Sequence, residues 1–120
     1  MIRSSMGAVQ DDLMKQEIKP DGEGREAVTI YRIQKMLSDA ALLEVRIKTG
    51  RTHQIRLHMA SEGHPLLGDS LYGTEKTSKM MERTMLHAWK LHFCQPFTGE
   101  QIDITAPIPN DMKELMERIE

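Results

Sequence analysis

The residues best suited to chemistry lie in one short stretch, TGRTHQIRLHMA, which runs from Thr49 to Ala60. It holds two arginines, two histidines and a glutamine, and it contains no acidic residue. Guanidinium groups bind phosphates and carboxylates, and imidazole groups transfer protons or hold metals. Three interpretations follow: a basic element that binds an anion, one wall of a catalytic site, or the polar face of an ordinary helix.

A metal site is not predicted. His53 and His58 are five residues apart, so they do not share a helical face as two histidines four apart would. The chain has neither an H-E-x-x-H motif nor paired cysteines, and it lacks a G-x-S-x-G elbow and a phosphate-cradling glycine loop. The basic stretch therefore remains the informative feature.

Charge supports the anion interpretation. Although the net charge is -2, the segment from Val45 to His58 carries Arg46, Lys48, Arg51 and Arg56 without an acid. Such a local excess is typical of a surface that meets an anionic partner, although a solvated face would look the same.

The surrounding pattern places the stretch between a strand and a helix. Residues 27–37 are rich in β-branched and aromatic side chains, and residues 42–50 alternate apolar and polar, which predicts a hairpin. A short helix of two to three turns should follow, with the Thr52 hydroxyl as its cap. Arg51 then stands in the turn before the helix, where backbone amides also favour phosphate, and Arg56 lies on the same side of the helix as His53.

Later segments complete an α+β fold. Residues 87–93 and 101–105 read as a second hairpin, and residues 110–119 as an amphipathic terminal helix. The fold class is thus a mainly antiparallel sheet from two hairpins, with a short helix after the basic strand and a C-terminal helix. Residues 1–26 have little periodicity and read as a poorly structured connector, and residues 27–120 form the domain.

Size and composition predict a cytoplasmic protein without a membrane partner. The 120 residues are 39% hydrophobic, as in one compact domain, and no run approaches the roughly 20 apolar residues of a membrane span. The first ten residues also lack the pattern of a signal peptide.

Several motifs together resemble the RluA-type family of RNA pseudouridine synthases. They are GRTHQIRLH, GHPLLGD and LYG, preceded by LLEVRIKT and followed by LHAWKLHFCQPFTGE and TAPIP. The resemblance extends from about residue 24 to the terminal helix. It implies an enzyme that breaks the N1–C1′ bond of a uridine within RNA, turns the base and rejoins it through C5, without a cofactor.

In that family an aspartate acts as nucleophile or base, an arginine matching Arg56 pairs with it, and a tyrosine from another motif lies against the base. The resemblance therefore makes Arg56 the catalytic-site residue here. The RNA, ribosomal or transfer, should meet the basic and polar residues of this region: Arg46, Lys48, Arg51, Thr52, His53, Gln54 and His58. His53 and Gln54 could instead hold the turn. The loop that follows would be ordered by His64, Gly68, Asp69 and Tyr72, although Asp69 could also position an RNA-facing arginine.

The sequence departs from the family at the aspartate. It is expected in an H-R-L-D stretch, which this chain lacks, as it lacks the tyrosine motif. The aspartates present all lie in other contexts: Asp11, Asp12, Asp21, Asp39, Asp69, Asp103 and Asp111. We therefore expect Arg56 to be exposed, bound to an anion or paired with a carboxylate from elsewhere. An in-chain aspartate paired with it in a closed pocket would supply the missing acid.

Two hypotheses remain. The chain is the C-terminal part of a pseudouridine synthase catalytic domain and is inactive alone, or it is a non-catalytic RNA-binding module or relic of the family. A partial domain would expose apolar surface through which it could self-associate, whereas an evolved module should be a monomer.

Overall fold

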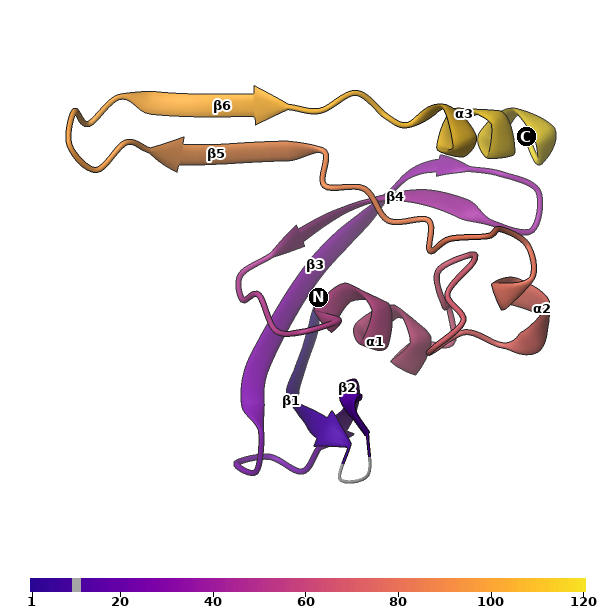
Figure 1. The fold of residues 1–120 in the computed structure, drawn as a ribbon, viewed down its shortest axis with the longest axis horizontal. Coiled ribbons are helices and arrows are strands. Elements are labelled where there is room, and N and C mark those ends of the chain that lie inside the picture. The colour runs from indigo at the N-terminus through magenta and orange to yellow at the C-terminus, as the bar shows by residue number, and fades with distance from the viewer. Residues whose placement is uncertain (10–11) are drawn as a thin grey trace. The chain divides into compact units, whose positions relative to one another are not determined.

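A computed structural model describes residues 1–9 and 12–120 of the chain (Figure 1). The chain divides into two compact units, Met1–Met85 and Leu86–Glu120, and each is described by itself. Both are built from antiparallel strands and short helices, as the α+β prediction requires. None of the helices in the described ranges has the length and apolarity needed to cross a bilayer.

The first unit contains a four-stranded antiparallel sheet with the strand order β2-β1-β3-β4. Its strands are β1 (Ile2–Val9), β2 (Asp12–Lys19), β3 (Arg25–Met36) and β4 (Ala41–Ile47). The β3–β4 pair is the hairpin predicted from the sequence, with Tyr31 opposite Val45. β1 lies between β2 and β3, so it is a central strand of the sheet.

The strands β1 and β2 depart from the expectation of a poorly structured connector over residues 1–26. Residues 10 and 11 of that range lie outside the described residues. The apolar residues that β1 buries, Ile2 and Met6, are four apart and separated by the polar residues Arg3, Ser4 and Ser5. Because the pattern does not alternate with period two, sequence periodicity gave no strand signal there.

One face of the sheet packs against α1 (Gln54–Ser61). Directly opposed residues of an antiparallel pair share a face, and Ser4 lies opposite Ala27 as Met6 lies opposite Arg25. Met6, Ala27 and Leu57 form the buried apolar cluster between sheet and helix, and Tyr72 packs against it. The core that positions the basic stretch is therefore small.

The start of α1 differs from the prediction. Its N-cap is His53 rather than Thr52, and no side chain caps the helix. His53 has a φ of 56°, which is left-handed and uncommon for a residue with a side chain. The tight turn places Gln54 rather than a capping hydroxyl against the preceding loop.

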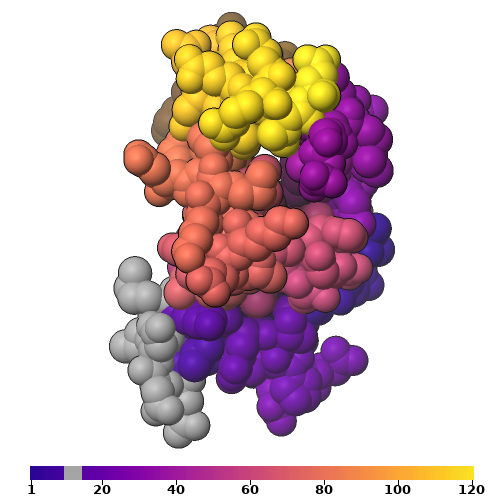
Figure 2. Space-filling model, turned by 90° about the vertical axis from the view of Figure 1, so that its right-hand side faces the viewer, coloured from indigo at the N-terminus to yellow at the C-terminus, as the bar shows by residue number. Residues whose placement is uncertain are grey.

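Residues 62–85 form an ordered loop beside α1 (Figure 2). It contains one turn of helix, α2 (Glu75–Ser78), that the sequence pattern did not predict and that Thr74 caps. Gly68 has a φ of 80°, and a Cβ placed there would lie 2.0 Å from the carbonyl oxygen of Arg83. Only glycine fits this close approach.

The second unit consists of the hairpin β5 (Lys90–Cys94) and β6 (Gln101–Thr105), followed by α3 (Asn110–Arg118). These elements confirm the predicted second hairpin and terminal helix. In α3, Asn110 is the first helical residue and Pro109 is the N-cap.

Candidate active-site wall

The centre of the site is an ion pair between α1 and the loop that follows it. Arg56 Nε donates to Asp69 Oδ2 at 3.0 Å, and its Nη2 donates to Asp69 Oδ1 at 2.7 Å. Asp69 Oδ1 also accepts the backbone N–H groups of Leu71 and Tyr72. The Asp69 side chain is fully buried, whereas 21% of the Arg56 side chain remains exposed.

The electrostatics keep both partners ionised. Burial alone would raise the pKa of Asp69, but the hydrogen bonds from Arg56, Tyr72 and Leu71 outweigh it and lower that pKa. The hydrogen bond to Asp69 raises the pKa of Arg56. Because Asp69 is inaccessible and both of its oxygens are occupied, it anchors Arg56 and cannot attack a substrate. Arg56 is thus paired with a carboxylate from outside the family's aspartate motif, and the chain lacks that motif's acid.

Tyr72 covers the same guanidinium. Its ring centroid lies 5.3 Å from Arg56 Cζ, a cation–π arrangement. The N–H of Gln16 donates to the Tyr72 hydroxyl oxygen at 2.8 Å, and that hydroxyl lies 2.8 Å from His53 Nδ1. Burial, and then the nearby Arg56 charge, lower the pKa of His53, so a neutral ring can accept the Tyr72 proton. These contacts tie β2 and the start of α1 to the loop.

His58 lies inside the protein and is fully buried. Its Nε2 is 2.6 Å from Ser4 Oγ, and its Nδ1 is 2.7 Å from Thr29 Oγ1. The ring therefore connects α1 to the two central strands, β1 and β3. Burial lowers its pKa and keeps the ring neutral.

Gln54 is also internal, with 3% exposure. Its Nε2 donates to the carbonyl of Val28 and to Thr29 Oγ1, and its Oε1 accepts from Thr49 Oγ1 and the N–H of Arg51. The amide thus holds the turn against β3. Both Gln54 and His58 were predicted to contact RNA, but their side chains are occupied inside this unit.

The predicted basic residues do not form one patch. Arg46 lies opposite Ile30, one position out of phase with Thr29, so it lies on the sheet face away from α1. Its guanidinium lies 3.7 Å from Glu44 Oε1. Lys48 follows the end of β4 and is exposed. Arg51 lies on the turn before α1, where its Nε donates to the carbonyl of Glu26 at 2.8 Å, and Thr52 is exposed beside it.

The residues that were predicted to order the loop after α1 make mainly backbone and buried side-chain contacts. The N–H of His64 donates to the carbonyl of Met59 and ends α1, while the His64 ring is exposed. Gly68 N donates to the carbonyl of Thr77. Asp69 and Tyr72 have the bonds described above. In the described part of the chain, no three histidine, cysteine or acidic side chains lie close enough to hold a metal ion.

Sequence reasoning missed two residues that support this site from β1 and β2, Ser4 and Gln16. Both lie in the segment interpreted as a connector, where no site residue was expected. Asp11, one of the aspartates weighed from the sequence, lies outside the described residues.

Comparison with known proteins identifies the class. A family model described as RNA pseudouridylate synthase matches residues 2–61, half of the chain. The chain belongs to this family, and the match begins at β1, well before residue 27.

Two curated relatives support the same family assignment. The chain is 45% identical over 112 residues to ribosomal large subunit pseudouridine synthase D of Zymomonas mobilis, and the alignment covers 88% of this chain and 35% of that protein. It is 44% identical over 118 residues to the uncharacterized RNA pseudouridine synthase YhcT of Bacillus subtilis, and that alignment covers 95% of this chain and 37% of that protein.

A solved structure, human RNA pseudouridylate synthase domain containing 1, superposes with a TM-score of 0.73 at 26% identity, covering 88% of this chain and 46% of that one. The chain spans about a third of the length of the curated relatives it matches.

Proposed function

We propose that this chain supplies one wall of the active site of an RNA pseudouridine synthase and is inactive without the part that carries the catalytic aspartate. A ribosomal RNA substrate in the cytoplasm is the specific form of the proposal, which the name of the Zymomonas relative supports. No cofactor or metal is required.

The observation that carries this proposal is the way Arg56 is held. Its Nε and Nη2 bind Asp69, and its Nη1 makes no hydrogen bond within the described residues. A fixed guanidinium with one unoccupied edge can receive a second carboxylate and keep it ionised. In the complete enzyme that carboxylate is the aspartate that reacts with uridine.

The remainder of the catalytic domain would also cover apolar surface. On the β3–β4 hairpin Ile33, Met36 and Ile47 are 57%, 67% and 49% exposed. Without a cover, such side chains favour self-association. We infer that the part of the catalytic domain present here begins at β1 rather than at residue 27, because β1 is central to the sheet.

The test is a chimera in which this chain replaces the matching 112-residue segment of the Zymomonas relative. Tritium at C5 of uridine is released when the new bond forms at C5, so its release from labelled ribosomal RNA measures activity. We expect the chimera to be active, the chain alone to release nothing, and Arg56→Ala to slow the chimera by about 100-fold or more. Arg32→Ala is the control, since Arg32 is an exposed arginine on β3 that binds Glu44. Equal rates for the two variants would refute the role of Arg56.

A non-catalytic RNA-binding module is the second candidate. The observation that favours it is a cleft lined by Arg25 and Arg51, which could bind RNA without any catalytic step.

A further inference from the structure

Two arginines of the first unit share one cleft without a carboxylate partner. Arg56 binds Asp69, and Arg3, Arg32 and Arg46 each have a carboxylate within 4.0 Å. Arg25 and Arg51 have no ion-pair partner among the described residues, and both line a cleft of about 540 Å³. Like charges that face one space are stabilised by an anion between them.

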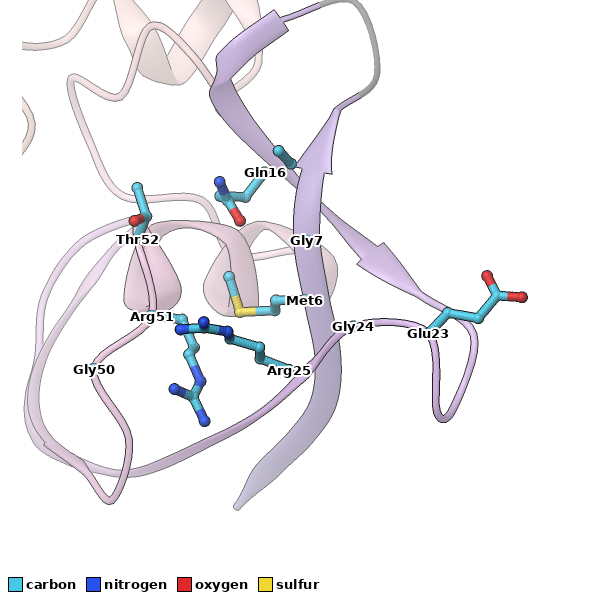
Figure 3. A pocket seen from close by; sticks show the side chains of 10 residues that line it. Met6, Gly7, Gln16, Glu23, Gly24, Arg25, Gly50, Arg51 and Thr52 are labelled. Carbon is cyan, nitrogen blue, oxygen red and sulfur yellow. The ribbon is translucent and has the colours of Figure 1, made fainter.

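The cleft lies between β1, the β2–β3 connection and the turn before α1. Figure 3 shows the Arg25 and Arg51 side chains directed into the same space, with the Glu23 carboxylate pointing away from it. The bond from Arg51 Nε to the carbonyl of Glu26 fixes one edge of that guanidinium and leaves its Nη atoms for a ligand. Arg25 lies opposite Met6, on the sheet face that carries α1.

The remaining walls suit a chain of phosphates rather than a base. Three glycines line the cleft, Gly7, Gly24 and Gly50. At Gly50 a Cβ would meet nothing within 4 Å, so a ligand can approach the backbone there. Among the described residues that line it none is aromatic, so these walls offer a base no ring on which to stack. Guanidinium forks match phosphate oxygens in pairs.

We propose that Arg25 and Arg51 together bind a phosphodiester of the RNA strand next to the uridine that Arg56 faces. This inference rests on the proposed function, because Arg51 and Arg56 belong to one turn and helix. It adds Arg25, which lies outside the basic stretch, and it removes Arg46 from the same contact, because Arg46 lies on the other face of the sheet.

The test measures binding of a fluorescent single-stranded uridine oligonucleotide to the full chain by anisotropy at several salt concentrations. Each lost phosphate contact should reduce the slope of log K against log salt by about 0.7, which amounts to about fivefold weaker binding at 0.1 M salt. We expect this loss for Arg25→Ala and for Arg51→Ala. If both arginines hold one phosphate, the double variant should lose less than the product of the two. Arg32→Ala is the matched control and should keep the wild-type slope.

A second pair of variants keeps the test independent of the Arg51 contact to Glu26. A Cβ at Gly50 meets nothing within 4 Å, so a side chain is tolerated there. We expect Gly50→Asp, which adds a negative charge to the cleft, to weaken binding at least as much as Arg25→Ala. Gly50→Asn, of the same size and neutral, should bind nearly as the wild type does.

Three results would overturn the proposal. Wild-type binding with no effect of Arg25→Ala would leave RNA binding intact but place it elsewhere. Inorganic phosphate that bound as tightly as the oligonucleotide would make the cleft a site for free anions. A wild-type chain that bound no RNA would remove this proposal and the RNA-binding module together, while the chimera would still report on catalysis.

Discussion

Replacing Asp69 with asparagine tests whether the buried carboxylate holds the site together. Asparagine has nearly the same shape and keeps an oxygen for the N–H groups of Leu71 and Tyr72. Its NH₂ group would face the Nε–H of Arg56, so two donors would meet where an ion pair now lies.

The size of the effect follows from the burial of the two partners. Breaking a buried ion pair costs about 3–5 kcal/mol. Arg56 retains 21% exposure and can regain water, so we expect a loss near the lower end, about 3 kcal/mol. With a urea slope of about 1.5 kcal/mol per molar, the unfolding midpoint should fall by about 2 M.

The assay is urea unfolding followed by NMR signals of the first unit, because Trp89 lies in the second unit and its fluorescence would report on that unit. Glu75→Gln is the control. Glu75 pairs with Lys79 on the same loop, but both side chains are largely exposed, so its removal should hardly move the midpoint. If Asp69→Asn cost no more than Glu75→Gln, the carboxylate would not anchor Arg56 and the reasoning would fail.

Three further predictions concern the same unit. Burial lowers the pKa of His58, so the unfolded chain binds a proton at higher pH than the folded one, and stability should fall as the pH drops below about 6.5, by up to about 1.4 kcal/mol per pH unit for this ring; urea midpoints at about pH 7.5 and 5.5 that coincide would contradict this. Gly68→Ala should destabilise far more than Gly63→Ala, since both have positive φ but only Gly68 would press a Cβ against the carbonyl of Arg83, and thermal melts of the two variants compare them. The chain should self-associate through the exposed apolar side chains of the β3–β4 hairpin, and light scattering should show less association when those side chains are made polar.

The sequence predicted the parts of the fold that have strong local signals. The alternation in residues 42–50 and the apolar spacing in residues 110–119 come from side chains that repeat with the period of a strand or a helix, and both elements are present. β1 escaped because its contacts are long-range. Ser4 and Met6 face a helix about 50 residues away, and no local pattern records that distance.

The sequence predicted which residues belong to the site but not how they are arranged. The motif predicted Arg56 as a catalytic-site residue, and in the structure two hydrogen bonds to Asp69 fix its guanidinium. The motif could not separate Gln54 and His58, which face the interior, from Arg51 and Thr52, which face solvent, because all four are polar. Whether each side chain lies toward the core or toward solvent depends on the left-handed backbone conformation of His53. The residue types in this stretch did not predict that conformation.

The Tyr72 hydroxyl has a consequence for how the complete active site is assembled. It joins the backbone of Gln16 to the ring of His53, and the Tyr72 ring lies over the Arg56 guanidinium that Asp69 already grips. The arginine is therefore preorganised before any catalytic aspartate arrives. A complementary polypeptide that carried the aspartate would not have to order this side chain when it docked. Association would therefore not lose the conformational entropy of the Arg56 side chain, and binding would be tighter by that amount. Two separately made parts of such an enzyme could then reconstitute a working site without being joined in one chain.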